Sequence, residues 1–475
     1  MSNKFIACIA VLAVACSSKG GSNDPVIPID PPVKASDVAF WLTNPDKSAL
    51  LKKQTVSLIF KDTVNIYPTI NVDETKTYQS IDGFGYTLTG GSASLINSLA
   101  PAAQDALLKE LFRTDSTFIG ISYLRISIGA SDLSATTFTY DDIPSGQTDT
   151  TLQQFSMEKE KADLIPILKK IVALAPDIKI LGSPWSAPVW MKTGGSFVGG
   201  SLKPEYYAAY AQYFVKYIQA MKAEGITIDA ITPQNEPLHG GNNPSMVMQA
   251  AEQASFIKNN LGPAFKAAGI STKIIAYDHN ADRPDYPAAV LGDAAAYPFV
   301  DGSAFHLYGG DISALTQVHN AFPDKNVYFT EQWVGGPGEF ASDLKWHVST
   351  LIIGATRNWS RNVLEWNLAA DPAYKPHTDG GCSTCLGALT IAGTVSRNVS
   401  YYIIAHAAKF VRPGSVRIGS EFTSQLENVA FKTPDGKRVL IVLNNAAAPQ
   451  TFNIRSNGKI VTTTLNNGAV GTYIW

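Results

Sequence analysis

Two glutamates occupy comparable places in the sequence, each at the end of a short run of apolar or small residues. Glu236 lies in the segment TPQNEP at 232–237, and Glu331 lies in YFTEQW at 328–333. Burying a lone carboxylate is costly, so each group should be solvated, paired or used for chemistry. An ion pair in a loop would explain either glutamate alone. Two of them, beside Asn235 and aromatic residues, indicate a shared site.

Paired carboxylates are what hydrolysis of a glycosidic bond requires. One carboxylic acid protonates the leaving oxygen, while the other carboxylate attacks or stabilises the anomeric carbon. Ionised Glu331 would raise the proton affinity of Glu236 and keep it an acid. Once Glu331 is glycosylated, its charge is gone and Glu236 can activate water. A gap of about 5 Å between the carboxyls predicts retention of configuration, whereas about 6.5–9.5 Å predicts inversion.

The middle of the chain must bring these groups together. Between residues 79 and 405, short apolar runs alternate with amphipathic stretches of ten to twenty residues, which predicts a parallel sheet in an α/β fold. We expect strands at 81–85, 122–128, 178–182, 230–235, 273–277, 302–306, 327–330 and 363–366, and helices at 102–112, 162–174, 204–223 and 246–268.

Eight strand–helix units fit a (β/α)8 TIM barrel, in which catalytic groups lie at the C-terminal ends of the strands. The fourth and seventh strands end in Glu236 and Glu331, which would then meet across the barrel mouth. A doubly wound open sheet is the structural alternative. No Gly-x-Gly-x-x-Gly follows the first strand, which weakens a dinucleotide-binding interpretation.

Both ends of the chain are typical of a β domain. Residues 36–78 and 406–475 contain short strand-like runs separated by turn residues, as at 54–60, 69–72, 439–443, 451–454 and 472–475. Chain termini often lie close together. We therefore expect the strands of 36–78 and of 406–475 to form one side β-sandwich domain beside the barrel of 79–405.

The first 35 residues predict export. Residues 1–16 combine Lys4, a short apolar run and LAVAC, which resembles a bacterial lipoprotein signal with Cys16 as the lipidated residue. An ordinary secretory signal with a chance cysteine is the alternative. Residues 17–35 are rich in Ser, Gly and Pro and are typical of a flexible tether. We expect a monomer that is lipid-anchored at the cell envelope, on the outer membrane surface or in the periplasm.

Composition and cysteine use limit the possible partners. The 475 residues carry a net charge of −2 with 16% charged residues, which gives no general attraction to nucleic acid. Beyond the N-terminal segment the cysteines are Cys382 and Cys385. Two cysteines alone cannot make a tetrahedral zinc site, but they can form a short-loop disulfide in an oxidising compartment. A redox Cys-x-x-Cys is the alternative, although a thioredoxin-like context is absent. No metal and no cofactor is implied, because paired carboxylates suffice.

Four motifs occur in an order that resembles one family. They are QSIDGFG at 79–85, LRISIGASD at 124–132, SPWSAPVWMK at 183–192 and NEP at 235–237. Together they resemble glycoside hydrolase family 30, which contains lysosomal-type glucosylceramidases and microbial endo-β-1,6-glucanases. The resemblance covers about 36–475. It implies a (β/α)8 barrel with a side β-sandwich built from both chain ends.

The resemblance also implies roles for individual residues. Glu236 would be the acid/base and Glu331 the nucleophile. Asn235 would bind the sugar 2-hydroxyl, and Arg125 would orient the nucleophile through charge-assisted hydrogen bonds. The other residues expected to bind substrate or to flank the nucleophile are Asp132, Trp185, His306, Tyr308, Trp333 and Trp366.

Four of these assignments have a structural alternative. Core packing would explain Trp185 and Trp366 equally well. An ion pair would account for Arg125. A histidine among small and apolar residues, such as His306, is more often a satisfied core residue.

The departure from the lysosomal-type enzymes lies at 376–387, where the chain reads PHTDGGCSTCLG. This run resembles the bacterial branch that includes β-1,6-glucanases, and a Cys382–Cys385 disulfide would pin it at the barrel mouth. We therefore expect an endo-β-1,6-glucanase acting on a β-glucan polysaccharide or oligosaccharide. The alternatives are an exo-acting β-glucosidase or glucosylceramidase, and an inactive surface lipoprotein that binds glycans.

Overall fold

Eight parallel strands close into a barrel in the computed structural model, which describes residues 35–475. In chain order they are β4 (Gly83–Thr87), β5 (Tyr123–Ser127), β6 (Lys179–Ser183), β7 (Ala230–Ile231), β8 (Lys273–Ala281), β9 (Val300–Gly310), β10 (Asn326–Glu331) and β12 (Ser360–Asn367). Each strand pairs with the next, and β12 returns to β4. The predicted (β/α)8 barrel is confirmed. The expected signal peptide at 1–16, its Cys16 and almost all of the 17–35 tether lie outside the described residues.

Side-chain size decides how the barrel closes. Its interior is filled by one layer of buried side chains from seven strands, namely Tyr123, Leu181, Ala230, Ile275, Ala304, Tyr328 and Leu364. Glycine is required where strands approach most closely. A Cβ on Gly85 would lie 1.8 Å from the carbonyl oxygen of Tyr123 on the neighbouring strand. The barrel is therefore a packed core, and only its rim is available for chemistry.

Helices surround the barrel and bury one face each. They are α1 (Gly90–Asn97), α2 (Pro101–Phe112), α3 (Leu164–Leu174), α4 (Tyr207–Ala223), α5 (Ala250–Phe256), α6 (Gly262–Ala267), α7 (Asp285–Gly292), α8 (Ala314–Ala321), α9 (Phe340–His347) and α10 (Val399–Ala408). A π-helical segment, Ile257–Leu261, joins α5 to α6, and another, η6 (Val348–Ala355), continues α9. Local signals fix several starts: Thr89 caps α1 by accepting from the Ser92 N–H, and proline begins α2.

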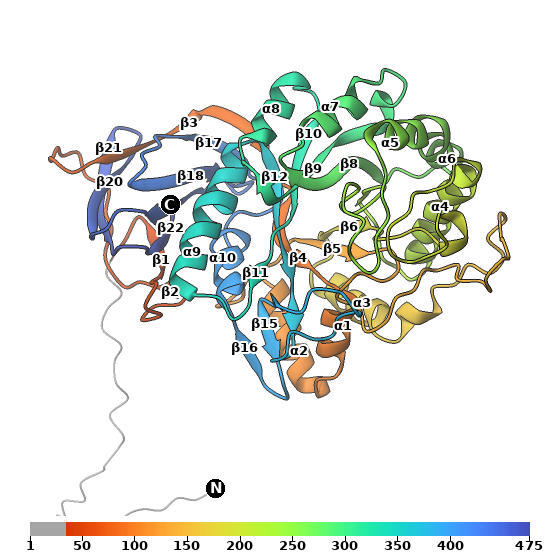
Figure 1. The fold of residues 1–475 in the computed structure, drawn as a ribbon. Coiled ribbons are helices and arrows are strands. Elements are labelled where there is room, and N and C mark those ends of the chain that lie inside the picture. The colour runs from red at the N-terminus through yellow and green to blue at the C-terminus, as the bar shows by residue number, and fades with distance from the viewer. Residues whose placement is uncertain (1–34) are drawn as a thin grey trace, which may run out of the picture. The chain divides into compact units, whose positions relative to one another are not determined.

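The second domain is a nine-stranded sheet that combines both ends of the described chain (Figure 1). Its order is β2 (Lys52–Lys53), β1 (Ala39–Thr43), β22 (Val470–Ile474), β19 (Arg438–Asn444), β18 (Leu426–Lys432), β17 (Val416–Ser420), β3 (Thr69–Ser80), β20 (Gln450–Ser456) and β21 (Lys459–Leu465). Strand β1 pairs with β22 over five residue pairs. The predicted sandwich from both chain ends is confirmed, and it has its own apolar core.

A buried histidine joins the barrel to the sheet domain. His406 of α10 makes 2.8 Å hydrogen bonds to the hydroxyls of Thr472 on β22 and Thr43 on β1. Burial lowers the pKa of His406 to about 3, so the ring is neutral. One helix of the barrel therefore bonds to strands from both ends of the described chain.

Small strands complete the rim. β11 (Val334–Gly335) pairs with β14 (Cys385–Leu386), and β13 (Ala369–Ala370), β15 (Leu389–Ile391) and β16 (Val395–Arg397) form a separate sheet. The strand expected at 54–60 is absent from the structure. That segment follows β1 with isolated bonds, such as Gln54 N–H to the Phe40 carbonyl, and half of Val56 is exposed. Alternation of residue types was misleading here because the segment has no partner strand. Within 35–475, no helix is long and apolar enough to cross a membrane.

Candidate active site

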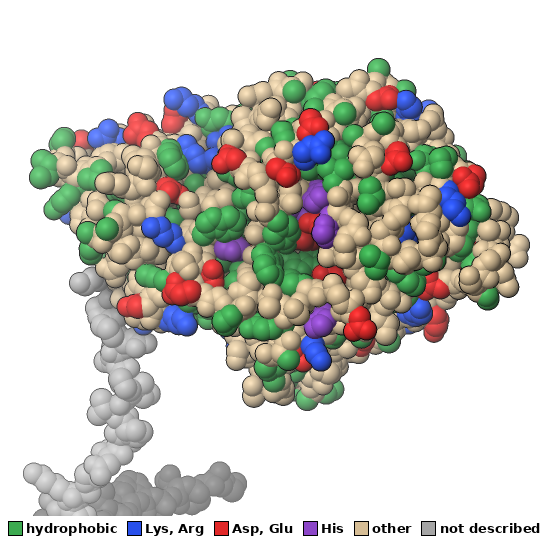
Figure 2. Space-filling view, in the orientation of Figure 1, with side chains coloured by type: hydrophobic (Ala, Val, Ile, Leu, Met, Phe, Trp, Pro, Cys, Tyr) green, Lys and Arg blue, Asp and Glu red, His purple; other side chains and the backbone are tan. Residues whose placement is uncertain are grey.

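The two glutamates reach one hollow at the C-terminal rim of the barrel. Glu236 follows β7, and Glu331 is the last residue of β10. Near the middle of Figure 2, histidine and acidic side chains lie beside hydrophobic ones in this hollow. The hollow has a volume of about 520 Å³. It is lined by Asp132, Trp185, Asn235, Glu236, His239, Asn242, His279, Asn280, Tyr308, Glu331, Trp333, Trp366 and residues 380–385.

The carboxylates of Glu236 and Glu331 are close neighbours. One oxygen of each, together with a ring nitrogen of His306, lies within 4.8 Å of the others. His306 Nδ1 is 3.0 Å from Glu236 Oε1 and 3.8 Å from Glu331 Oε1. This spacing matches the short carboxyl separation of retaining glycosidases and is too small for an inverting enzyme to fit a water.

Glu331 is held as an acceptor from two sides. Arg125 Nη1 donates to Glu331 Oε2 at 2.6 Å, and the hydroxyl of Tyr308 donates to Oε1 at 3.0 Å. The other terminal nitrogen of Arg125 donates to Asn235 Oδ1 at 2.6 Å. That bond orients the Asn235 amide so that its NH2 group is the part left to donate. Arg125 is fully buried, so its charge is compensated by these partners rather than by water.

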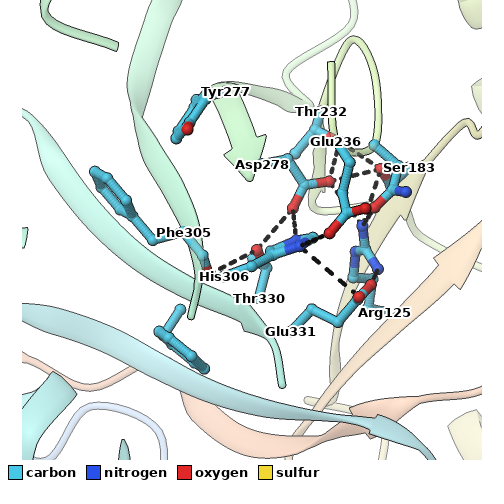
Figure 3. A network of polar contacts seen from close by, with 12 residues as sticks. Arg125, Ser183, Thr232, Glu236, Tyr277, Asp278, Phe305, His306, Thr330 and Glu331 are labelled. Carbon is cyan, nitrogen blue, oxygen red and sulfur yellow. Dashed lines mark hydrogen bonds and ion pairs between the residues drawn. The ribbon is translucent and has the colours of Figure 1, made fainter. Parts of the chain in front are cut away.

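Asp278 connects this pair to the barrel, and the sequence analysis did not identify it. It is completely buried just after the run 273–277. Figure 3 shows it facing His306 and the Glu236 side of the network. Its carboxylate oxygens accept hydrogen bonds of 2.7–3.0 Å from Arg125, Ser183, Thr232, His306 and Thr330. Asp278 follows the predicted strand 273–277, just as Glu236 and Glu331 follow theirs. That position was the sequence signal that could have identified it.

The backbone is strained at these positions. Glu236, Tyr277 and Asp278 have φ values of 44°, 76° and 73°, which non-glycine residues rarely adopt. The Glu236 N–H donates to the Asp278 carbonyl at 2.9 Å, which ties the two strained segments together. Such conformations cost about 1–3 kcal/mol each and persist where the surrounding structure enforces them, often at functional sites.

Burial and charge set the protonation of the site. Burial alone would lower the pKa of His306, but the three carboxylates around the ring outweigh it and raise that pKa to about 9. Burial opposes ionisation of Asp278, yet Arg125 and His306 hold its pKa well below the usual range. His306 is therefore a cation that donates from both ring nitrogens.

The two glutamates titrate as a coupled pair. Burial raises the pKa of Glu331 and, together with the Glu236 charge, outweighs the opposing effects of His306 and Arg125. Burial is also the largest single effect on Glu236, but the hydrogen bond and the charge of His306, with smaller contributions from other histidines, together outweigh it and lower the pKa of that carboxyl. Two cations, Arg125 and His306, face three carboxylates, so one shared proton on the Glu236–Glu331 pair balances the charge.

Three tryptophans and a disulfide form one wall of the hollow. Trp185 and Trp366 stack with ring centroids 5.4 Å apart, and the Arg125 guanidinium lies 4.7 Å from the Trp185 ring. Trp333 packs against the same cluster. The disulfide Cys382–Cys385 closes the neighbouring loop.

The disulfide loop also holds Asp132. The backbone N–H of Cys382 donates to Asp132 Oδ2 at 3.3 Å. Burial, with a smaller contribution from Glu331, raises the pKa of Asp132 to about 7.

The structure thus brings every expected site residue of the barrel to one place. Eight of the expected residues line the hollow, whereas Arg125 and His306 lie directly behind it, bonded to the carboxylates. Glu236, His306 and Glu331 also have the ligand types and spacing to hold a metal ion. The guanidinium of Arg125 against Glu331 and the proton on His306 disfavour a second cation at that point.

Comparison with protein families decides the relationship. Residues 81–411 match the glycosyl hydrolase family 30 TIM-barrel domain, and residues 414–473 match the glycosyl hydrolase family 30 beta sandwich domain. The chain belongs to glycosyl hydrolase family 30. The resemblance inferred from the four motifs is confirmed.

Several relatives of this family 30 chain have described activities. An endo-1,6-beta-D-glucanase of Neurospora crassa is 38% identical over 397 residues, which cover 79% of this chain and 81% of that protein. The lysosomal acid glucosylceramidase of Mus musculus is 28% identical, with coverages of 84% and 82%. A solved structure described as an endo-beta1,6-glucanase superposes with a TM-score of 0.86 at 37% identity, covering 93% of this chain and 99% of that one.

Proposed function

We propose that this family 30 glycoside hydrolase is a retaining endo-β-1,6-glucanase. The observation that carries the chemistry is the placement of Glu236 and Glu331 oxygens within 4.8 Å of each other at the rim of the barrel. The relatives that support the substrate are the endo-1,6-beta-glucanases, which are 36–38% identical, whereas the mouse glucosylceramidase is 28% identical. Cleavage within a chain requires a hollow that is open to solvent, and Tyr308 in its lining is 40% exposed.

In the first step Glu331 attacks the anomeric carbon while Glu236 protonates the departing glycosidic oxygen. Without substrate, the raised pKa of Glu331 and the lowered pKa of Glu236 put the shared proton on Glu331. The first step requires that proton on Glu236 in the substrate complex, where Arg125 and Tyr308 donate to the Glu331 anion. The 3.0 Å bond from His306 keeps a further proton within reach of Glu236. The bond that forms joins the Glu331 oxygen to the anomeric carbon, and the bond that breaks frees the leaving-group hydroxyl.

In the second step Glu236 takes a proton from water, which attacks the glycosyl–Glu331 ester and restores the anomeric configuration. The NH2 group of Asn235 is placed to donate to the sugar 2-hydroxyl, because its oxygen is already engaged by Arg125. Asp132, Trp185, Trp333 and Trp366 supply the hydroxyl acceptor and the flat surfaces for the glucose in this hollow.

The test is hydrolysis of pustulan, a linear β-1,6-glucan, with products followed over time. We expect mixed oligosaccharides early in the reaction and β-configured first products by NMR. Glu331→Gln should lose on the order of 10⁴-fold in kcat. Glu331→Gly with azide should form an α-glycosyl azide. Azide occupies the place of the missing carboxylate and attacks the anomeric carbon from the face opposite the leaving group. Glucose as the only product would instead identify an exo-acting glucosidase, and a wild-type protein that binds but never cleaves β-glucans would contradict the proposal.

We also propose that the protein is exported and anchored through Cys16. The support is the lipoprotein-like segment at 1–16 and the Cys382–Cys385 disulfide, since disulfides persist in oxidising compartments. Cell fractionation checks this proposal. Wild type should remain with the membrane fraction, and Cys16→Ser should be released; equal release of both proteins would contradict the anchor.

A further inference from the structure

A second hollow adjoins the catalytic one. It has a volume of about 640 Å³ and lies where the last residues of β9 and the two that follow, the α9–η6 helix and the sheet domain meet. Tyr308 lines both hollows, so the two share this side chain and lie next to each other. We call this second hollow the distal groove and define it by Tyr308, Trp346, Arg357, Phe422 and Glu427.

Exposed aromatic rings gather in the distal groove. Five aromatic residues are among the exposed large apolar side chains of residues 35–475, namely Tyr67, Tyr78, Tyr308, Trp346 and Phe422. Three of the five line this groove, with Tyr308, Trp346 and Phe422 exposed by 40%, 41% and 50%. Figure 2 shows hydrophobic side chains continuing from the central hollow toward the sheet domain. Clustered exposed rings mark a binding surface more often than scattered ones do.

These rings come from both domains and are held in place. Trp346 is near the end of α9, where His347 anchors the helix through a 2.7 Å bond to Glu365. Phe422 lies in the loop between β17 and β18, and the guanidinium of Arg357 is 5.0 Å from its ring centroid. Arg357 itself donates to the Asn428 carbonyl at 3.0 Å. The groove is therefore a formed surface at a domain junction, a common position for ligand sites.

Charged groups line the distal groove together with the rings. Asp311, Arg357 and Glu427 line the groove, and Glu427 accepts hydrogen bonds from Ser349 and Asn445. A hexose presents C–H faces that pack on a flat ring and hydroxyls that bond to such groups. An acyl chain would cover the same charges without offering any hydrogen bond, which is costly. The mixture favours a carbohydrate over a lipid.

We infer that the distal groove binds further glucose units of the β-1,6-glucan, with Trp346 and Phe422 as stacking platforms beyond Tyr308. This inference rests on the proposed function, because it assigns the glucan a path past the catalytic hollow and onto the sheet domain. The groove makes cleavage depend on chain length: a chain long enough to reach Phe422 gains contacts that a short oligosaccharide cannot make.

The test compares Trp346→Ala and Phe422→Ala with wild type on a series of β-1,6-linked oligosaccharides and on pustulan. For long chains we expect kcat/KM to fall about fivefold for each variant, the size of a lost aromatic contact. The loss should vanish for the shortest oligosaccharide that wild type cleaves. Trp346→Phe keeps a flat ring and should recover most of the rate on long chains. Tyr67→Ala removes an exposed ring of the sheet domain outside the groove and is the matched control.

The outcomes separate this inference from the function on which it rests. If wild type does not cleave β-1,6-glucans, the proposed function fails. If wild type cleaves them and both alanine variants act on every chain length as wild type does, the groove assignment alone is overturned. It is also overturned if the losses are equal for short and long chains, or if they appear for dodecyl β-glucoside and not for glucans, which would identify a lipid-binding groove.

Discussion

Two buried histidines of this chain differ in charge: the one at the catalytic rim is a cation, and the one at the seam between the domains is neutral. Both are fully buried, and both ring nitrogens of each make hydrogen bonds. His306 faces the carboxylates of Glu236 and Asp278, and its pKa is raised to about 9. His406 faces two threonine hydroxyls, and burial lowers its pKa to about 3.

The difference shows that partners, and not burial, decide what a histidine does here. Carboxylates around His306 compensate a positive charge, so the ring is a proton reservoir beside Glu236. Hydroxyls around His406 compensate no charge, so the neutral ring is a connector between α10 and the strands of the sheet domain. The catalytic rim thus concentrates charges in strained backbone, whereas the contacts that His406 makes at the seam are neutral hydrogen bonds.

Asp278→Asn should have the largest effect on the difference between the two histidines, because it gives His306 an uncharged partner like those of His406. The pKa of His306 should fall below 9, and Arg125 should lose its charged partner opposite Glu331. We expect kcat to fall about 10²–10³-fold, within the range of lost acid–base and electrostatic assistance. Imidazole NMR shifts across pH measure the first effect and steady-state kinetics the second.

Thr330→Val is the control for that variant. It removes one 2.7 Å hydrogen bond to Asp278 but leaves the carboxylate in place. Its loss in kcat should be about tenfold or less. An imidazole of His306 that stays protonated at pH 8 in Asp278→Asn would show that Asp278 does not set its charge.

A matched pair of variants, His306→Gln and His406→Gln, sharpens the comparison at both ends. His306→Gln should lose about 10–100-fold in kcat, since Glu236 loses its cationic donor. His406→Gln should keep the wild-type kcat but lose about 1–3 kcal/mol of unfolding free energy, because the shorter side chain cannot keep both buried hydrogen bonds to Thr43 and Thr472. Steady-state kinetics measures the change in kcat, and thermal unfolding of the same preparations measures the change in stability. A drop in kcat for His406→Gln would contradict its role as a connector.

Parts of this contrast were accessible from the sequence, and parts were not. Glu236 and Glu331 follow apolar strand runs, and the barrel topology places such ends on one rim, so the catalytic pair could be predicted. Its neighbours were expected only from the resemblance to family 30. Asp278 also follows a strand run. Its role depends on partners from several strands, which no local pattern records. Trp346 and Phe422 were missed for the same reason, because they meet only when α9 packs against the sheet domain.

The fold shows the same limit. Alternation and strand–helix order predicted the barrel and the pairing of both chain ends, because burial enforces those periods. The same alternation at 54–60 produced no strand, since a strand also needs a free partner edge and this segment found only isolated bonds.

The pH dependence of unfolding offers a smaller effect that separates the two histidines. His406 has a usual pKa of 6.5 when unfolded and about 3 when folded, so below pH 6.5 the unfolded chain binds a proton that the folded chain excludes. Its contribution to stability is therefore lost as the pH falls from 6.5 toward 3. For His306 the folded pKa of about 9 exceeds 6.5, so its contribution is present below 6.5 and lost as the pH rises through 9.

Urea unfolding between pH 4 and pH 9 measures both the acid limb of the stability profile, which His406 controls, and the basic limb, which His306 controls. Each histidine contributes at most about 1.4 kcal/mol per pH unit within its own window. His406→Gln should flatten the acid limb and leave the basic limb unchanged, whereas His306→Gln should do the reverse. Identical curves for the two variants would mean that other groups control both limbs.

The smallest expected effect concerns the disulfide loop beside the catalytic rim. Cys382–Cys385 closes a loop with a sequence separation of 3, so it constrains the unfolded chain little and should add little to stability. Its effect should instead be on substrate binding, because the Cys382 N–H contacts Asp132 and β14 pairs with β11 just after Trp333. The double variant Cys382→Ser with Cys385→Ser should raise KM for pustulan about threefold while kcat and the melting temperature barely change. Reductant should reproduce this rise in wild type and add nothing to the double variant. A large fall in melting temperature with an unaltered KM would instead make the disulfide a brace for the fold, like His406 at the seam.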